Sequence, residues 1–309
     1  MDRIRLGLML HPTRDVTEVV GIIADWVARH RMSLAVRAAD RHRVPATVEP
    51  LPADEVAATC DALISIGGDG TMLGALRSAV RDPKPVLGVH LGRLGFLVEV
   101  EPPDLPAALE RLANKDFVVE RHSCLACDVC GDDVVAFNDI ALVRQPGSGF
   151  VTATLGVDGQ QYGYYRCDAL VVSTPTGSTA YSYAAGGPLV SPASDAVVIT
   201  PSAPMAGISR SVILSPDEHI RLELTPGSAP VAVEMDGLVI RDAATEGAVE
   251  VTYRRDAGLV VRLDPRRYQE RNQLKLSLLD LPLLPEQLRE LLPEGLREQV
   301  NRRALPPMR

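Results

Sequence analysis

Lysine is scarce in this sequence of 309 residues, which contains only Lys84, Lys115 and Lys275. Acidic residues outnumber basic ones by 40 to 32, and the formal net charge is −8. This charge argues against a nucleic acid or an anionic membrane as partner, because either would bind a basic face. None of the lysines follows a glycine loop, so the sequence lacks the Gly-Lys-Ser/Thr ending of a P-loop.

Two further kinds of segment are missing. No Gly-x-Gly-x-x-Gly run opens a helix after a strand, so a hydride-transferring dinucleotide fold has little support. No apolar stretch approaches the roughly 20 residues of a membrane-spanning helix. Residues 1–5 lead straight into a strand-like segment, without the pattern of a signal peptide. We therefore expect a cytoplasmic protein with neither nucleic acid nor a membrane as partner.

The five cysteines include a C-x-x-C-x-x-C run, formed by Cys124, Cys127 and Cys130. Such spacing occurs in zinc and iron–sulfur sites, but the surrounding residues predict a strand. Side chains of a strand alternate between its faces, so Cys124 and Cys130 share one face while Cys127 points to the other. One ion cannot collect all three thiols, and we expect no bound metal. The thiols are expected to be half-buried, as is common in a reducing compartment.

The most informative stretch is Gly-Gly-Asp-Gly-Thr (GGDGT) at residues 67–71, with Asp69 at its centre. It follows an apolar run at 62–66, typical of a buried parallel strand, and precedes apolar spacing that predicts a helix. Glycines let a phosphate approach the backbone, and the first N–H groups of a helix point at it. A carboxylate there would repel phosphate unless it accepts a proton or holds a metal. The turn therefore indicates phosphoryl transfer; the alternative is an ordinary Gly/Asp turn.

The pattern along the chain changes from alternating strands and helices to strands alone. Residues 1–117 predict an α/β domain, Rossmann-like with a parallel sheet, that contains the GGDGT turn. Residues 118–264 hold short β-like runs separated by turns such as Asp158-Gly159 and Asp236-Gly237, and predict a β-rich, sandwich-like domain. The tail at 265–309 predicts short amphipathic helices, and we expect it to return to the first domain and pack there.

The expected elements are as follows. In the first domain, strands are expected at 5–10, 33–37, 62–66 and 85–89, and helices at 17–30 and 105–113. In the second, strands are expected at 118–130, 134–137, 151–157, 169–173, 196–200, 211–214, 219–224, 231–235, 249–254 and 260–263. In the tail, helices are expected at 285–292 and 294–302.

A second motif, at residues 173–182, is rich in serine and threonine. Hydroxyls and exposed backbone N–H groups suit ribose and phosphate oxygens, and Tyr181 or Tyr183 can pack near a base. On its own this composition is more usual in a mobile surface loop.

Together with GGDGT, this motif makes the chain resemble the NAD kinases. The resemblance also covers residues 88–97 (GVHLGRLGFL), 137–140 (FNDI), 165–170 (YRCDAL) and 174–192 (TPTGSTAYSYAAGGPLVSP). Diacylglycerol-type lipid kinases and phosphofructokinases share GGDGT, whereas the 174–192 block separates NAD kinases from both. The resemblance implies transfer of a phosphoryl group from ATP or polyphosphate to the 2′-hydroxyl of the adenosine ribose of NAD, giving NADP.

The resemblance also implies roles for individual residues. Asp69 would be the general base that deprotonates the ribose hydroxyl, and Asn138 and Asp139 would bind the ribose and adenine portion. The further residues expected to bind substrate or nucleotide are Gly67, Gly68, Gly70, Thr71, Arg166, Asp168, Thr179, Ala180, Tyr181, Ser182, Tyr183 and Ala184. A divalent ion such as Mg²⁺ would accompany the donor, and a homodimer or homotetramer would complete part of the site from a neighbouring subunit.

Several alternatives stay open at this stage. Asn138-Asp139 can be a turn-capping pair, and Arg166 with Asp168 a surface ion pair. Met205 stands in a stretch where family members carry Pro-His, and Leu238 stands where glutamine often follows the Asp-Gly pair, which leaves the preference between NAD and NADH open. A lipid or other small-hydroxyl kinase of the same superfamily is the second interpretation. A lipid kinase would need an apolar slot or a membrane-facing patch, which the polar 174–192 block does not predict. A non-catalytic dinucleotide-binding regulator would gain nothing from the Asp69 carboxylate.

Overall fold

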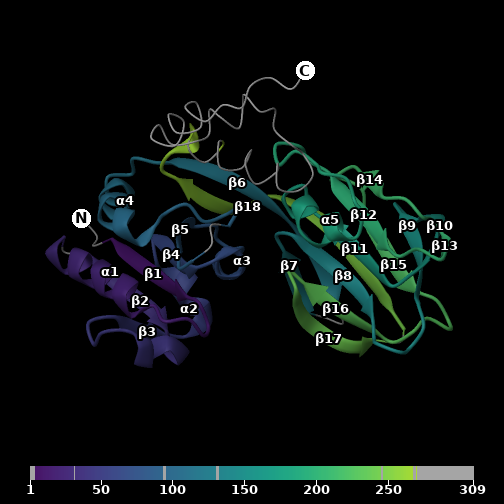
Figure 1. The fold of residues 1–309 in the computed structure, drawn as a ribbon, viewed down its shortest axis with the longest axis horizontal. Coiled ribbons are helices and arrows are strands. Elements are labelled where there is room, and N and C mark those ends of the chain that lie inside the picture. The colour runs from purple at the N-terminus through teal and green to yellow at the C-terminus, as the bar shows by residue number, and fades with distance from the viewer. Residues whose placement is uncertain are drawn as a thin grey trace, which may run out of the picture.

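The computed structural model describes residues 4–266, apart from 31, 93–94, 130–131 and 245, together with residue 269. An α/β lobe that holds the N-terminal residues lies beside a β-rich lobe (Figure 1). The strands of the α/β lobe run parallel in the order β5-β4-β1-β2-β3. Their bounds are β1 (Arg5–Leu10), β2 (Ser33–Arg37), β3 (Glu49–Leu51), β4 (Ala62–Gly67) and β5 (Pro85–His90).

Helices cover both faces of this parallel sheet. The apolar side chains of α1 (Thr17–Arg29) and α4 (Leu105–Ala113) share one core with the sheet. Those of α2 (Ala53–Thr59) and α3 (Asp69–Ser78) share the core on the other face. Two 3₁₀ turns, η1 (Ala38–Arg43) and η2 (Pro102–Asp104), connect the elements. The predicted Rossmann-like lobe follows from apolar runs that are buried on both faces, as parallel strands require.

Two sheets pack face to face in the β-rich lobe. One is a six-stranded sheet in the order β14-β12-β11-β8-β16-β17; the other continues the sheet of the α/β lobe. The strands of the first are β8 (Asp139–Arg144), β11 (Ala169–Ser173), β12 (Val197–Ser202), β14 (Val212–Leu214), β16 (Val231–Met235) and β17 (Leu238–Ala244). Those of the second are β6 (Val118–Val129), β7 (Asp132–Ala136), β9 (Val151–Val157), β10 (Gln160–Cys167), β13 (Ala206–Gly207), β15 (Ile220–Leu224) and β18 (Ala248–Arg262).

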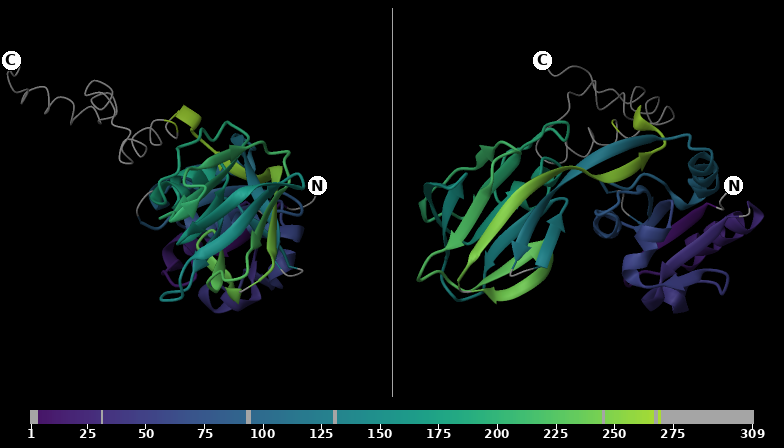
Figure 2. Two further views of the ribbon diagram at one scale, coloured as in Figure 1. Left: turned by 90° about the vertical axis from the view of Figure 1, so that its right-hand side faces the viewer. Right: turned by 180° about the vertical axis from the view of Figure 1, so that it is seen from behind.

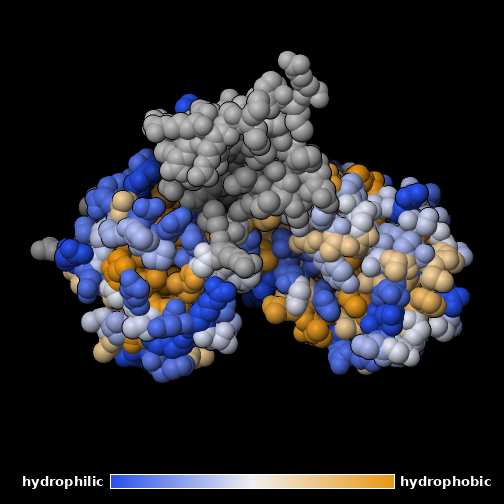
Figure 3. Space-filling view, viewed as in Figure 1, coloured by the Kyte–Doolittle hydropathy of each residue, from blue (hydrophilic) through white to orange (hydrophobic). Residues whose placement is uncertain are grey.

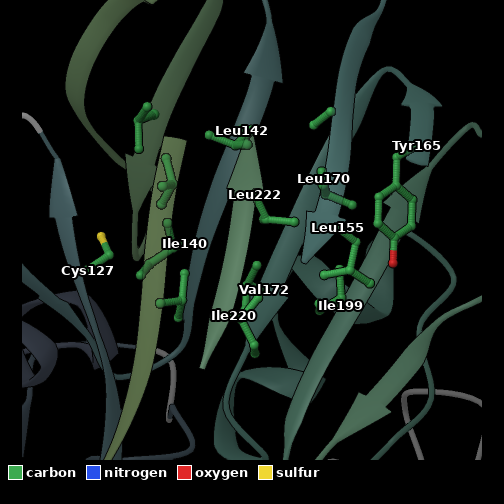
Figure 4. Packing of buried hydrophobic residues seen from close by; sticks show 14 of the residues in the cluster. Cys127, Ile140, Leu142, Leu155, Tyr165, Leu170, Val172, Ile199, Ile220 and Leu222 are labelled. Carbon is green, nitrogen blue, oxygen red and sulfur yellow. The ribbon is translucent and has the colours of Figure 1, made fainter. Parts of the chain in front are cut away.

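Inward-facing side chains of both sheets form one core (Figure 4). Along β9, buried and half-buried residues alternate strictly, as expected for a strand with one face against a core. Leu155 of β9 and Leu222 of β15 face Ile140 of β8 and Leu170 of β11 across the interface between the sheets. The β-sandwich-like architecture predicted for this region is confirmed.

The long strand β18 joins the two lobes into one sheet of twelve strands. Its first part pairs with β15, its whole length pairs antiparallel with β6, and Leu259 and Val260 pair parallel with β5. Figure 2 shows β18 running beside β6 from one lobe into the other. The expectation of two separate strands at 249–254 and 260–263 is wrong. The polar residues between them form a bulge, with Asp256 at φ 54°, and not a turn that ends the strand.

The predicted fold class, a parallel α/β domain followed by a β-rich domain, is confirmed. The expected boundary between residues 117 and 118 falls after α4 and before β6. The expected helices at 285–292 and 294–302, and the docking of the tail, lie outside the described residues. Among the residues that the structure describes, no helix is long and apolar enough to cross a membrane.

The cysteines of β6 point to different cores. Cys124 packs in the core beneath α3, and Cys127 packs in the β-sandwich core, as strand alternation predicts. Cys130 lies outside the described residues. Cys60 and Cys167 are also buried, so the expectation of half-buried thiols is wrong for these four: each lies inside a core and not at its margin.

Candidate active site

The GGDGT turn connects the end of β4 to the start of α3. Gly67 is the last residue of the strand and Asp69 the first residue of the helix. A Cβ on Gly67 would lie 2.2 Å from the hydroxyl oxygen of Thr71, so only glycine fits under that side chain. The turn thus exposes backbone N–H groups at a helix N-terminus, the arrangement that binds phosphate.

The Asp69 carboxylate is held by the backbone of residues 95–97. The Phe96 N–H donates to Oδ2 at 2.7 Å, and the Leu97 N–H donates to Oδ1 at 2.9 Å. A Cβ on Gly95 would lie 2.0 Å from Oδ1, so glycine lets this segment close over the carboxylate. Each carboxylate oxygen has a further lone pair, which remains for a substrate hydroxyl.

A cavity of about 770 Å³ opens at the turn, between the lobes. Figure 3 shows the surface hollowed in this region. Gly67, Gly68, Gly70 and Thr71 of the predicted site line the cavity. Its other lining residues are Met9, Leu10, His11, Pro12, Arg14, Arg37, Gly74, Arg77, Gly92, Asp236 and Leu238. Its three arginines are Arg14, Arg37, which also pairs with Asp40 at 2.8 Å, and Arg77, which also pairs with Asp236.

Asp236 ties the two lobes together beside this cavity. It occupies the first position of the two-residue turn between β16 and β17, with φ 46°, and Gly237 follows with φ 77°. Its buried carboxylate accepts from Arg77 of α3 at 2.5 Å and from the backbone N–H of Asn138 at 2.7 Å. The N–H groups of Phe137 and Asp139 also donate to it, each at 3.2 Å. Sequence reasoning saw only a turn here, because no local pattern shows a partner 159 residues away.

The 137–140 segment lies against the hydroxyl-rich loop. The Thr174 N–H donates to the Asn138 carbonyl at 2.9 Å, and the Thr174 hydroxyl donates to the Phe137 carbonyl at 2.7 Å. A Cβ on Gly177 would lie 1.9 Å from the Asn138 carbonyl oxygen. The glycine of this loop therefore permits a close approach of two backbone segments.

Asp139 is buried at the start of β8 and accepts a hydrogen bond from the backbone N–H of Tyr181. Burial and the nearby negative charge of Asp236 raise its pKa to about 7, although the Tyr181 hydrogen bond acts in the opposite direction. A carboxyl group with this pKa changes its charge near neutral pH. Its position in a sheet shows that Asp139 does not merely cap a turn.

The remaining residues of the predicted loop form two short helical turns, η3 (Thr176–Thr179) and α5 (Tyr181–Ala184). The buried Ser182 hydroxyl lies 3.0 Å from that of Thr200 and supports the loop from below. Thr179, Ala180, Tyr181 and Tyr183 are half-buried and Ala184 is exposed. Ser182 is thus placed to hold the loop, whereas its neighbours are accessible to solvent.

Two predicted residues lie apart from the GGDGT turn. Arg166 is exposed on β10, at the far side of the β-rich lobe (Figure 1), with its guanidinium 5.0 Å from the centre of the Phe150 ring. Asp168 pairs with Arg144 at 2.8 Å, so the alternative of an Arg166–Asp168 ion pair is wrong. The negative charge of Asp168 also reaches Tyr181, whose pKa is raised mainly by burial.

Metal ligands do not gather at one point of the described chain. Within the residues that the structure describes, no group of three or more His, Cys, Asp or Glu side chains has a geometry suited to a metal ion. The two carboxylates near the cavity are already engaged, Asp69 by backbone N–H groups and Asp236 by Arg77.

Comparison with known proteins identifies the family of this chain. Residues 11–117 match the ATP-NAD kinase N-terminal domain, and residues 137–263 match the ATP-NAD kinase C-terminal domain. The chain belongs to the NAD kinase family. An NAD kinase from Rhodococcus erythropolis is 33% identical over 88% of this chain and 93% of its own length. One from Desulforamulus reducens is 32% identical over 75% of this chain and 83% of its own length. The predicted family and phosphotransferase activity are confirmed.

Two solved structures share the fold of this NAD kinase family member. Yeast NADH kinase complexed with NADH has a TM-score of 0.76 at 21% identity, covering 92% of this chain and 90% of that chain. An NAD kinase from Archaeoglobus fulgidus in complex with ATP has a TM-score of 0.68 at 24% identity, covering 88% and 98%. Both show that the parallel sheet and the β-sandwich form one recurring architecture.

Proposed function

We propose that this member of the NAD kinase family transfers the terminal phosphoryl group of ATP or polyphosphate to the 2′-hydroxyl of the adenosine ribose of NAD, with Asp69 as general base. The ribose O–H bond breaks and its proton passes to the Asp69 carboxylate. The freed ribose oxygen bonds to the terminal phosphorus, and the bond from that phosphorus to its bridging oxygen breaks. ADP, or a shortened polyphosphate, leaves with the electron pair.

One observation carries this proposal: a carboxylate is fixed in place at a phosphate-binding helix N-terminus. A ribose hydroxyl is a weak nucleophile at neutral pH, so it needs a base within hydrogen-bond reach. Two backbone N–H groups hold the Asp69 carboxylate in one orientation. A carboxylate in a fixed orientation accepts a proton more efficiently than one on a mobile side chain.

The donor phosphates are proposed to bind in the cavity at the turn. Gly67, Gly68 and Gly70 offer a surface without side chains, and Arg14 and Arg37 also line the cavity and bring positive charge to it. Mg²⁺ would neutralise the phosphates when bound with the donor, and it usually keeps several waters and few protein ligands. The chain's own part is to position the donor and to hold the proton acceptor.

The adenosine of NAD is proposed to bind between Asn138, Asp139 and the segment at 179–184. These residues are brought together by contacts between β8 and the loop, and they present a carboxyl group, backbone groups and the tyrosine rings. The alternative lipid kinase has less support, because Arg14, Arg37 and Arg77 line the cavity beside its apolar residues, and the 174–192 block is rich in hydroxyls. A regulator without catalysis has less support because Asp69 is held by contacts that a mere phosphate binder would not need.

A homodimer or homotetramer in the cytoplasm is proposed as the working form. Arg166 supports this, because it is exposed on a strand far from the GGDGT turn of its own chain (Figure 1). Asp168 and Arg166 would then serve a site completed by a neighbouring subunit. Light scattering of the purified protein tests the assembly; a monomer that is fully active contradicts it.

The decisive experiment on the reaction is Asp69→Asn. Purified protein is supplied with NAD, ATP and Mg²⁺, and NADP is measured through an NADP-specific dehydrogenase. Loss of a general base costs about 10²–10⁴ in kcat, or about 3–5 kcal/mol of barrier. NAD affinity should stay nearly unchanged. Asp25→Asn, an exposed aspartate on α1, is the matched control. A variant that retains more than a tenth of the wild-type kcat shows that Asp69 is not the base.

A further inference from the structure

The segment that holds Asp69 is itself held from behind by the end of β18. Arg262, the last residue of that strand, donates from Nη1 to the carbonyl oxygen of Leu97 at 2.7 Å. Leu97 is the same residue whose N–H donates to Asp69. Leu97 thus connects Asp69, the proposed base, to the guanidinium of Arg262, which lies 165 positions after Leu97 in the sequence.

A second pair of contacts fixes the same segment. The carboxylate of Glu99 accepts from the N–H of Asp264 at 2.8 Å and from the N–H of Leu263 at 3.3 Å. Glu99 is buried, and the neighbouring Val100 N–H donates to the Gly88 carbonyl of β5 at 3.0 Å. Residues 97–100 are therefore anchored on one side to β5 and on the other to the end of β18.

Arg262 is buried within a small cluster of charges. Its Nε donates to Oε2 of Glu120 on β6, and Oε1 of Glu120 lies 3.0 Å from Nε2 of His122. Burial would raise the pKa of Glu120, but the hydrogen bond from His122 and the charge of Arg262 outweigh it and lower the pKa to about 2. Glu120 is thus ionised throughout the physiological range, and the guanidinium has a permanent counter-charge.

The cluster also reaches the hydroxyl-rich loop. Nδ1 of His122 lies 3.4 Å from the hydroxyl oxygen of Thr176 in η3. The Arg262–Glu120–His122 cluster is therefore connected to the proposed base through Leu97 and to the adenosine loop through Thr176. A planar guanidinium is suited to this place, because its donors point in fixed directions and can bind a carboxylate and a carbonyl together.

We propose that Arg262 is a positioning residue for phosphoryl transfer: through Leu97 it fixes the orientation of the Asp69 carboxylate. The inference rests on the proposed role of Asp69 as general base. It accounts for why an arginine is buried beside the site without lining the cavity in which the phosphates are proposed to bind. A loss of this contact allows residues 95–97 to shift, and a displacement of about 1 Å at a reacting group can cost 10²-fold in rate.

The test compares three variants. Arg262→Gln removes the positive charge. The double variant Glu120→Gln/Arg262→Gln removes the charges of both partners. Arg262→Lys keeps the positive charge but loses the planar guanidinium with its several donors. The double variant avoids leaving the half-buried Glu120 without its arginine partner, which would threaten folding. Arg255→Gln, an exposed arginine of the same strand that pairs with Asp195 and Asp217, is the matched control.

For every variant that melts cooperatively, kcat and the KM values for NAD and ATP are measured. We expect kcat to fall roughly 10–100-fold, with both KM values within about twofold of wild type and Arg255→Gln unchanged. Lysine should not rescue the rate, because one ammonium cannot replace the fork. Folded variants that keep kcat within twofold of wild type overturn the inference.

A double-mutant cycle separates positioning from general damage. If Arg262 acts through Asp69, Arg262→Gln lowers kcat in the wild-type background but has little further effect in an Asp69→Asn background. An equal loss in both backgrounds assigns Arg262 a structural role and overturns the inference. Asp69→Asn alone tests the base: if that variant stays active, the proposed role of Asp69 as general base fails whatever Arg262 does.

Discussion

Asp139 makes a measurable contribution to how stability depends on pH. Asp139, at the start of β8, is 4% exposed. Burial, with the charges of Asp236 and Glu234, raises its pKa from 3.8 to about 7, against the effect of the Tyr181 N–H. The substitution Asp139→Asn keeps the size of the side chain and an oxygen acceptor for that N–H, but removes the titration.

The sign and size of the effect follow from linkage. Between pH 4 and 7 the folded protein keeps a proton on Asp139 that the unfolded chain has released. The contribution is therefore fully present at low pH and is lost as pH rises from about 4 to about 7, after which it is constant. A shift of about three pKa units corresponds to roughly 4 kcal/mol. The Asp139→Asn variant has no carboxyl group at this position, so its unfolding free energy should not decrease by this amount over the same pH range.

The assay is urea unfolding of both proteins at pH 5 and pH 8, at constant ionic strength. The quantity of interest is the change in unfolding free energy between the two pH values, compared between wild type and variant. We expect the wild type to lose roughly 3 kcal/mol more than Asp139→Asn over this interval, because most of the titration range lies inside it. Asp25→Asn, on the exposed face of α1, should behave as wild type. A difference below about 1 kcal/mol would refute the reasoning.

Three further outcomes are expected. Gly95→Ala should lower kcat by roughly 10-fold or more, because its Cβ would lie 2.0 Å from Oδ1 of Asp69; steady-state kinetics at wild-type rate would contradict this. Asp236→Ala should lower the unfolding free energy by about 3–5 kcal/mol in urea, since Arg77 loses its partner; a loss below 1 kcal/mol would not fit. Elemental analysis should find no stoichiometric zinc or iron, because the β6 thiols point into separate cores; one chelator-resistant ion per chain would overturn that expectation.

Local patterns were sufficient to predict most elements of the fold. The strand at 151–157 and the helix at 105–113 agree with β9 and α4 because their apolar residues repeat with the period of the element. The strand β10 was missed because its residues are mostly polar or tyrosine, and only Tyr165 and Cys167 face the core. The strand β8 was missed because its start, Asp139, suggested a turn.

The site was predictable only where its residues are contiguous. The GGDGT turn carries its own signature, since a strand, glycines and a helix start occur within ten residues. The partners of Asp69 and Asp236 could not be predicted, because they are brought in by the fold from positions 27 to 159 residues away. Arg262 gave no signal at all in the sequence, where it ends an apolar run like many surface arginines.

The path of β18 has a consequence for how this protein is made. In the α/β lobe, the strand that pairs with the free side of β5 is β18. During synthesis, β18 is available for this pairing only after about residue 262 has left the ribosome. Until then, β5 presents an unpaired edge, and its apolar neighbours lack Val260 as a packing partner. An unpaired strand edge of this kind can form backbone hydrogen bonds with strands of other chains, which promotes aggregation. Fragments that stop near residue 117 should therefore aggregate, and chaperones should engage the nascent chain during most of its synthesis.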